Sequence, residues 1–248
     1  MSVVSVRNVA KSFRIPAPDR QTVRENLLGF LRPRATQEMR ALDGISFTVE
    51  KGSAVGILGR NGSGKTTLMR ILAGIYLPDR GAVEIAAPDT PILGLGVGWN
   101  EELDAIDNVC LLGTVLGFSL AELRAGMDEI LEFAELERFA TTPLRQYSSG
   151  MKVRLAYAVA FRSVSDILLL DEVFAVGDAG FKKRCRQRCE TFKAAGHTTL
   201  LVSHDPDEVR SFCERGILLE NGKIMVDDTA DRAVEAYLAL LDGAPRRA

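Results

Sequence analysis

Apolar segments recur along the chain and predict two groups of β-strands. The first group predicts a β-rich antiparallel edge and comprises Val3–Val6, Ile45–Val49 and Ala82–Ile85. The second group alternates with helical stretches, which predicts a parallel sheet covered by helices. It comprises Ala54–Leu58, Asp166–Leu170, Thr198–Val202 and Ile217–Glu220. This order predicts an α/β fold with a mostly parallel sheet and an antiparallel N-terminal β edge.

The stretch from about residue 99 to 162 has helical periodicity in place of strand signals, as Leu120, Leu123 and the run Ile130–Phe133 illustrate. We therefore predict a helical lobe inserted into the sheet domain. A last helix is predicted from about Ala230 to Leu241, before a short tail with proline and arginine. The length of 248 residues fits one domain over residues 1–248.

Residues 14–40 interrupt the first predicted hairpin with an insertion that contains an amphipathic helix. Apolar side chains of the segment Val23–Leu31 share one helical face, and Pro33 ends the helix. From Arg7 to Arg40 there are eight basic residues against three acidic ones. Two interpretations stay open: a solvated loop with a packed helix, or a helix that contacts anionic lipid at a membrane surface.

The segment Gly59–Thr66 has the spacing Gly-x-x-x-x-Gly-Lys-Thr and lies between the apolar run Ala54–Leu58 and the helical pattern Leu68–Leu72. In this context backbone N–H groups surround phosphates, and the helix N-terminus adds positive partial charge. Lys65 is expected to reach the terminal phosphates, and the Thr66 hydroxyl is a predicted Mg²⁺ ligand. The predicted nucleotide-binding residues here are Gly59, Arg60, Asn61, Gly62, Ser63, Gly64, Lys65, Thr66 and Thr67. The sequence thus predicts a nucleoside triphosphate site.

Two acids, Asp171 and Glu172, follow the apolar residues Ile167–Leu170 at the expected end of a buried parallel strand. The carboxyl ends of such strands open at the ligand crevice of the sheet. We expect Asp171 to hold the Mg²⁺ shell through water and Glu172 to polarise an attacking water. The alternative, a strand that merely ends at two solvated acids, ignores the phosphate loop upstream.

The segment Tyr147–Met151, Tyr-Ser-Ser-Gly-Met, opens a well-patterned helix with a hydroxyl cap that is ready to bind an anion. As a local pattern it is equally typical of an N-capped structural helix. Before an acidic strand, it resembles the signature motif of ABC-transporter ATPases, usually Leu-Ser-Gly-Gly-Gln. The resemblance implies an ABC-type P-loop ATPase fold, ATP and Mg²⁺ as cofactors, and an ATP-bridged dimer of two copies. In that dimer Ser148, Ser149 and Gly150 face the ATP held by the phosphate loop of the other copy.

Three further residues match positions of that family. His204 ends an apolar strand and resembles the switch histidine that contacts the γ-phosphate; a structural histidine is the alternative. Asp178 ends the segment Ala175–Asp178, which is similar to the loop that crosses to the partner ATPase. Phe13 resembles the aromatic residue that stacks on adenine, and an ordinary core or surface phenylalanine fits its pattern equally well. The resemblance implies Glu172 and His204 as the catalytic residues.

Longer stretches narrow the resemblance to the ATPases of bacterial polysaccharide exporters, which move capsular polysaccharide, lipopolysaccharide O-antigen or teichoic acid. These stretches are Ala41–Phe47, Lys152–Ala160 and Asp171–Phe181. The resemblance implies an integral membrane partner, a lipid-linked glycan as indirect cargo, and a place at the cytoplasmic face of the inner membrane. An ABC ATPase for another exported cargo, such as a lipid or drug, and a soluble non-transport ABC ATPase are the alternatives. A kinase leaves the signature segment unexplained.

One departure from the family concerns the glutamine that usually senses Mg²⁺ and the attacking water. No Gln occurs between Val83 and Cys110, where the Gly-rich stretch Ile92–Asn100 stands instead and resembles that of the polysaccharide exporters. The usual glutamine role is therefore left without an assigned residue. Trp99, the sole tryptophan, is either a core anchor or a docking contact for the membrane partner.

Composition limits the function classes further. Charged residues make up 26% of the chain and its net charge is −2, so there is no global basic field for nucleic acid. No apolar run reaches the roughly 18 residues of a membrane span, so a transport pore requires another chain. The four cysteines lack metal-ligand spacing and are compatible with a reducing cytosol.

The basic insertion leads to a testable expectation for export. We expect the double variant Arg24→Glu, Arg32→Glu to fold and to hydrolyse ATP nearly normally in isolation. Glycan export in cells should fall sharply, because each arginine contributes about 1 kcal/mol near an anionic surface. Export at the normal level in this variant would identify the segment as a solvated loop with no role in transport.

Overall fold

The computed structural model describes residues 1–16, 36–86, 92–93, 99–162, 166–172 and 177–243. Within these ranges the strands form a three-stranded and a six-stranded sheet. The strands are β1 (Ser2–Pro16), β2 (Thr36–Glu50), β3 (Ala54–Leu58), β4 (Arg80–Ile85), β5 (Ile92–Leu93), β6 (Ile167–Asp171), β7 (Thr198–Val202), β8 (Arg215–Glu220) and β9 (Lys223–Thr229). The α-helices are α2 (Lys65–Leu72), α3 (Ala105–Val115), α4 (Leu120–Ala125), α5 (Met127–Ala134), α6 (Ser149–Ala160), α7 (Ala179–Ala194), α8 (Pro206–Phe212) and α9 (Ala230–Asp242).

The six-stranded sheet has the order β5-β6-β7-β3-β8-β9, in which only β9 runs antiparallel to its neighbour. Strand β3 lies inside this sheet between β7 and β8. Its register places Ala54 opposite Thr199 and Val55 opposite Arg215. All five residues of β3 are buried, which explains its uninterrupted apolar sequence.

A hydrophobic core covers each face of this sheet, because successive side chains along a strand point to opposite faces. In β6, Leu168 and Leu170 belong to the core with α7, α8 and α9, whereas Ile167 and Leu169 belong to the core with α2. The three-stranded sheet, of order β2-β1-β4, packs on the α2 side. Both faces are therefore shielded from water, as a parallel sheet requires.

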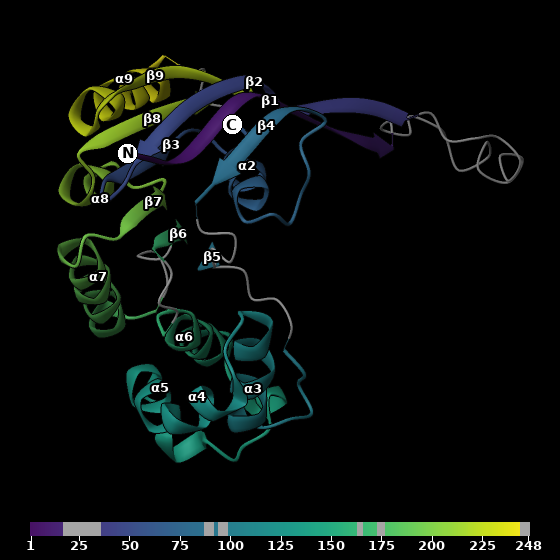
Figure 1. The fold of residues 1–248 in the computed structure, drawn as a ribbon, viewed down its shortest axis with the longest axis vertical. Helices are drawn as coiled ribbons and strands as arrows, with labels where there is room; N and C mark the ends of the chain where they lie inside the picture. Colours follow the sequence, from purple (N-terminus) through teal and green to yellow (C-terminus); the bar gives the residue numbers. More distant parts are fainter. Residues whose placement is uncertain (17–35, 87–91, 94–98, 163–165, 173–176, 244–248) are drawn as a thin grey trace, which may run out of the picture.

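A third core lies in the helical lobe of α3 to α6, which Figure 1 shows apart from the sheets. Local capping explains where its helices begin. The Asp104 side chain accepts from the Asp107 N–H at the start of α3, and Ser119 forms a capping box with Glu122 at the start of α4. Trp99 is partly buried against this core. Two short 3₁₀ turns, Glu137–Phe139 and Leu144–Gln146, lead into α6.

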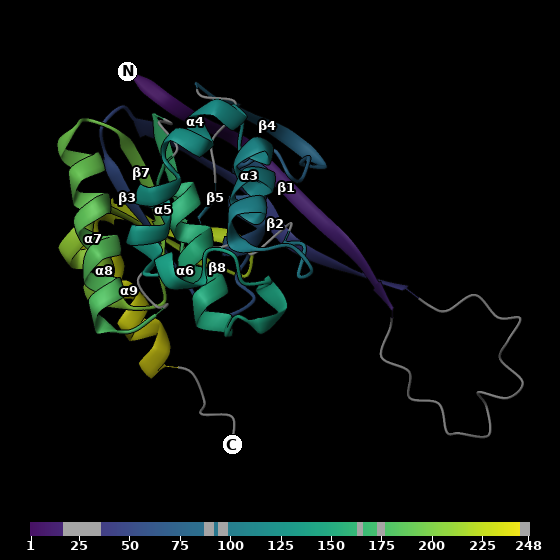
Figure 2. The ribbon, with the colours of Figure 1, turned by 90° about the horizontal axis from the view of Figure 1, so that it is seen from below.

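The predicted fold class is confirmed, and the structure corrects several strands. The prediction missed β5 and β9, and the strand predicted at Asp166–Leu170 lies one residue later. The first hairpin is longer than expected, because Arg14 pairs opposite Glu38. Residues 14–16 and 36–40 of the expected insertion thus belong to β1 and β2, which Figure 2 shows extending from the body. The predicted helix Val23–Leu31 and most of the Gly-rich stretch lie outside the described residues.

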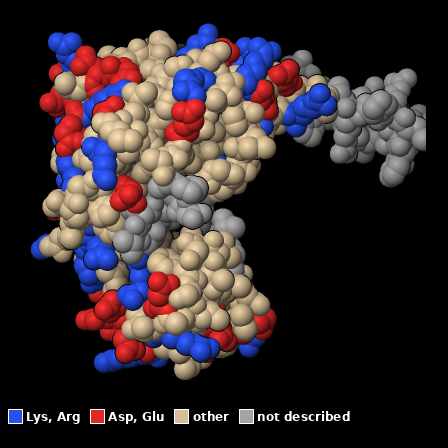
Figure 3. Space-filling model, viewed as in Figure 1, with Lys and Arg blue, Asp and Glu red and all other residues tan. Residues whose placement is uncertain are grey.

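Two properties of the described residues bear on binding partners: the distribution of surface charge and the apolar character of the helices. On the face shown in Figure 3, acidic and basic side chains are intermixed over the described residues. None of the helices in the described ranges combines the length and the apolar character that a bilayer crossing needs.

Candidate functional site

The phosphate loop connects the buried strand β3 to α2 by a path that requires glycine. Gly64 has φ +110°, in the left-handed region, and a Cβ there would lie 2.5 Å from the carbonyl oxygen of Ala41. A Cβ on Gly59 would lie 2.2 Å from the carbonyl oxygen of Leu219. No side chain in the described structure caps α2, so its first N–H groups face outward from the helix end. Such an N-terminus attracts phosphate.

Lys65, the first residue of α2, is buried, with 7% of its surface exposed. Its Nζ donates hydrogen bonds to the carbonyl oxygens of Gly59, at 2.7 Å, and Arg60, at 3.0 Å. Burial lowers the pKa of this ammonium, and nearby carboxylates, Glu172 foremost, oppose the shift. The lysine thus lies folded over the loop, between carbonyl groups and acids.

Ser63 tests whether the loop suits a phosphate. Its side chain is 3% exposed, and its Oγ finds no hydrogen-bond partner among the described residues. The backbone around it is held, since its N–H donates to Arg60 at 3.1 Å and its carbonyl accepts from Gly222 at 3.0 Å. A buried hydroxyl without a partner costs about 1–3 kcal/mol. A phosphate oxygen in the loop is a chemically suitable acceptor for it.

The loop opens into a cleft of about 560 Å³, a size typical of small-molecule sites. The cleft brings most of the predicted nucleotide and metal residues together, namely Asn61, Gly62, Gly64, Lys65, Thr66, Thr67, Asp171 and Glu172. Sequence reasoning missed the rest of its lining: Met39, Arg40 and Ala41 on β2, Val153 and Tyr157 on α6, and Val202 on β7. The cleft therefore lies where the phosphate loop, β2 and the lobe meet.

Asp171 ends β6 at the carboxyl edge of the sheet. Burial raises the pKa of its carboxyl, and Glu172 adds to the rise, whereas Lys65 and Arg70 oppose it. A divalent cation held beside Asp171 would favour the ionised carboxylate and reverse this shift. The electrostatics of the position therefore suit a cation.

Glu172 lines the cleft and contacts His204, which the lining does not include. The backbone of Glu172 has φ +52°, which L side chains adopt rarely, and its N–H donates to the Val202 carbonyl at 2.9 Å. Its carboxylate is about half exposed, with Oε1 3.2 Å from Nδ1 of His204. Such a conformation costs on the order of 1 kcal/mol and persists because neighbours hold it. The structure thus joins the two predicted catalytic residues directly.

The signature residues lie on another surface. The Ser148 side chain caps α6 by accepting from the Met151 N–H at 3.2 Å, and both Ser148 and Ser149 are exposed. Ser148, Ser149 and Gly150 are absent from the cleft lining, whereas Val153 and Tyr157 of the same helix belong to it. The start of α6 therefore lies outside the lining of the cleft of its own chain.

Asp178 begins α7 and also lies outside the cleft lining. Its Oδ1 accepts from the Phe181 N–H at 2.9 Å, and its other oxygen pairs with Arg154 of the lobe. The Phe181 hydrogen bond, foremost, and the two arginines nearby keep the pKa of Asp178 low. The acid is thus ionised and held between a helix N-terminus and the lobe.

Phe13 lies on β1, where its ring meets Tyr76 edge-on with centroids 5.6 Å apart. It is not a lining residue, although its register partner Met39 is. Asn100 also lies outside the lining. Its backbone N–H donates at 2.9 Å to Oδ1 of Asn108, a fully buried amide that lies in no motif of the sequence.

Comparison with known proteins agrees with this geometry. The family model described as ABC transporter matches residues 42–175. The O-antigen export system ATP-binding protein RfbB of Klebsiella pneumoniae is 41% identical over 79% of this chain and 80% of its own length. The RfbB protein of Myxococcus xanthus is 40% identical over 90% of this chain. The matched region is only 53% of the length of that relative. The teichoic acids export ATP-binding protein TagH of Staphylococcus epidermidis is 32% identical over 97% of this chain and 90% of its own length.

Solved structures share the fold. A dimeric ATP-binding cassette in a post-hydrolysis state, bound to ADP and phosphate, has a TM-score of 0.72 at 24% identity, covering 92% of this chain and 98% of that one. An ATP-binding subunit of an ABC transporter has a TM-score of 0.73 at 23% identity, covering 98% of this chain and 95% of that one. The family match spans the phosphate loop, the signature and both acids. The chain therefore belongs to the ABC transporter family of ATPases.

Proposed function

We propose that this chain powers export of a lipid-linked polysaccharide across the inner membrane through a separate membrane subunit. Relatives named for O-antigen and teichoic acid export support this class of cargo. An ABC ATPase for another exported cargo is the alternative. In the proposed assembly the chain docks peripherally on its membrane partner at the cytoplasmic face, and the glycan contacts it only indirectly.

The observation that carries the shared ATP site of this proposal is the separation of the predicted site residues between the cleft and the start of α6. Lys65, Asp171 and Glu172 line one cleft, whereas Ser148 and Gly150 lie at the exposed start of α6, outside it. A second copy facing the cleft supplies the missing anion-binding helix end in our proposal. The dimeric cassettes of similar fold support this arrangement.

The cleft residues fit ATP with Mg²⁺. The uncapped start of α2, the Lys65 ammonium and the unpaired Ser63 hydroxyl provide donors for phosphate oxygens. Thr66 would supply an oxygen ligand of the kind Mg²⁺ prefers, and Asp171 would hold a water molecule of its coordination shell. Bound Mg²⁺ neutralises charge that develops on the phosphates. The adenine ring of ATP would lie near Phe13 on β1, whose register partner Met39 lines the cleft.

Glu172 is the general base in the proposed hydrolysis. Its half-exposed carboxylate accepts a proton from the water that attacks the γ-phosphate. The hydrogen bond from the backbone N–H of Glu172 to the Val202 carbonyl holds the residue in the cleft lining. His204, whose Nδ1 lies 3.2 Å from Oε1 of Glu172, orients the carboxylate. In the proposed complex it also contacts the γ-phosphate. The remaining residue of the proposed machinery, Asp178, faces the other copy.

Sedimentation of a slow-turnover variant tests the shared site. We expect Glu172→Gln to sediment as a dimer with saturating ATP and as a monomer without it, because each nucleotide then bridges a phosphate loop and a signature helix. The double variant Glu172→Gln, Lys65→Ala is the matched control and should stay monomeric. A Glu172→Gln protein that is monomeric in saturating ATP, even with its membrane partner present, contradicts the proposal.

A further inference from the structure

A cluster of charged side chains joins the helical lobe to the start of α7. Nη1 of Arg154, on α6, lies 2.6 Å from Oε2 of Glu135, and its Nη2 pairs with Asp178. Glu135 follows α5, and its Oε1 lies 2.6 Å from Nη1 of Arg184 on α7. The ion pairs Asp178–Arg154–Glu135–Arg184 therefore cross twice between the lobe and α7. We call these four residues the clamp.

Both arginines of the clamp lie over the aromatic ring of Phe181. The guanidinium carbons of Arg154 and Arg184 lie 5.4 Å and 5.7 Å from the ring centroid of Phe181, within the range of cation–π attraction. Phe181 is fully buried and meets Phe133 of α5 edge-on at 5.7 Å. One ring of α7 thus supports both arginines and contacts the lobe.

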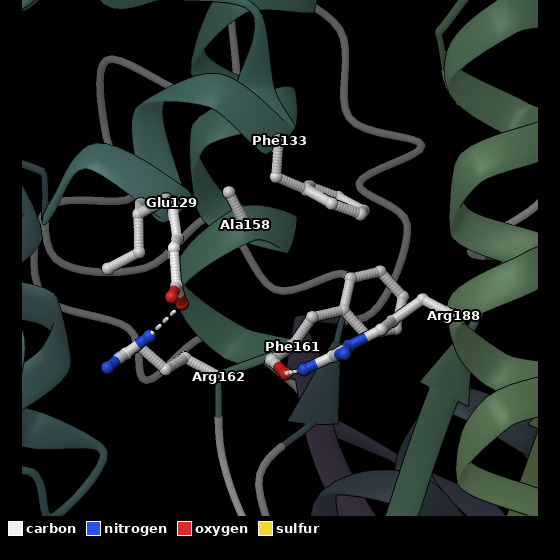
Figure 4. A pocket seen from close by; sticks show the side chains of 7 residues that line it. Glu129, Phe133, Ala158, Phe161, Arg162 and Arg188 are labelled. Atoms are coloured by element: carbon white, nitrogen blue, oxygen red, sulfur yellow. Dashed lines mark hydrogen bonds and ion pairs between the residues drawn. The ribbon is translucent and has the colours of Figure 1, made fainter. Parts of the chain in front are cut away.

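A small pocket lies beside this ring, where Arg188 of α7 meets residues of the lobe. A cavity of about 150 Å³ is bordered by Phe133, Phe161 and Arg188 (Figure 4). Arg188 donates to the Phe161 carbonyl at 3.2 Å, and Arg162 pairs with Glu129 of α5 at 2.7 Å. The ion pairs of the clamp and the buried aromatic contacts of Phe181 together join the lobe to α7.

The backbone conformation of Glu135 indicates that its side chain is kept for the ion pairs with Arg154 and Arg184. Glu135 has φ +58° at the end of α5, a left-handed position where glycine or asparagine is favoured. The hydrogen bond from Arg184, foremost, holds the pKa of Glu135 below its usual value, so the carboxylate is ionised at neutral pH. An acid therefore occupies a position whose backbone favours glycine, and it contacts two arginines.

We propose that Arg154 and Glu135 are positioning residues that fix the signature helix relative to Asp178, so that a second copy meets both as one unit. This inference rests on the proposed shared ATP site. Arg154 lies on the same helix as the Ser148 cap, about 9 Å further along the axis. Fixing Arg154 to α7 therefore fixes Ser148 as well. Because the two elements are aligned before association, less conformational freedom is lost when the dimer forms.

Removing the Glu135 side chain tests the clamp without straining the backbone. In the Glu172→Gln background we expect Glu135→Gly to weaken ATP-driven dimerisation at least about fivefold in sedimentation, a typical size for coupling between sites. Its thermal stability should change little, because glycine relieves the left-handed conformation and half-exposed ion pairs contribute little. ATP affinity at protein concentrations too low for association should not change. A residue with only a structural role would lower the thermal stability instead.

Glu129→Gln is the matched control. It removes another carboxylate–arginine pair of α5 that does not reach α7, and should leave dimerisation within twofold of the Glu172→Gln parent. Equal dimerisation of the Glu135→Gly variant and the parent overturns the clamp, and so does an equal loss in Glu129→Gln. Failure of the parent itself to dimerise with ATP is a different result, because it rejects the shared site on which the clamp rests.

Discussion

Replacement of Glu172 by Gln is expected to lower ATP turnover by about 10²–10⁴-fold, the usual contribution of a general base. The amide keeps the size of the side chain but cannot accept the proton of the attacking water. ATP binding should persist, because phosphate donors lie on the loop and on α2, and the Val202 contact uses the backbone of Glu172. Steady-state phosphate release and equilibrium binding of ATP measure the two effects separately.

Glu137→Gln, an exposed change in the lobe, is the control for the same chemical substitution and should hydrolyse ATP normally. Turnover of Glu172→Gln at the rate of the unmodified chain would remove Glu172 from the catalytic role. In that case the left-handed backbone at Glu172 and its contact with His204 would need a structural explanation.

Lys65→Ala is expected to abolish nucleotide retention. The substitution removes the buried cation of the loop and leaves the carboxylates of Asp171 and Glu172 facing the phosphates without it. ATP at 100 times its dissociation constant stabilises a protein by about 2.7 kcal/mol. The unmodified chain should therefore melt several degrees higher with ATP, whereas Lys65→Ala should melt at the same temperature with and without it.

The exposed lysine Lys51, replaced by Ala, is the control and should retain the full ATP-dependent shift in melting temperature. A Lys65→Ala protein that shows the same shift would exclude the phosphate loop as the ATP site. The melting temperature without ATP also reports whether the buried lysine matters to the fold itself.

Local sequence was sufficient for the core of the site. The strand β3, the loop, α2 and the acidic end of β6 each lie within a few neighbouring residues, so periodicity and spacing define them. Strand β9 was missed because apolar and polar residues do not alternate along its sequence, Lys-Ile-Met-Val-Asp-Asp-Thr, in which Met225 is exposed. It is held as a strand by pairing with β8, where Asp227 forms a bidentate ion pair with Arg215 at 2.5 and 2.6 Å.

Long-range pairing also explains the missed parts of the cleft. Met39 and Arg40 lie on a polar extension of β2, and the register with β1 is what brings them to the phosphate loop. The clamp was missed for the same reason, because Glu135, Arg154 and Arg184 are distant in sequence and share no motif. Spacing rules do not reach residues that meet only through tertiary structure.

The place of β3 between β7 and β8 has a consequence for synthesis of the chain. Its partners, Thr199 on one side and Arg215 on the other, are translated long after Ala54 and Val55. Contacts between such distant segments form slowly, because the intervening chain must first be closed into a loop. The strand that carries the phosphate loop therefore lacks both neighbours while the lobe is being made. A ribosome-bound chain that ends before β7 should have no competent ATP site.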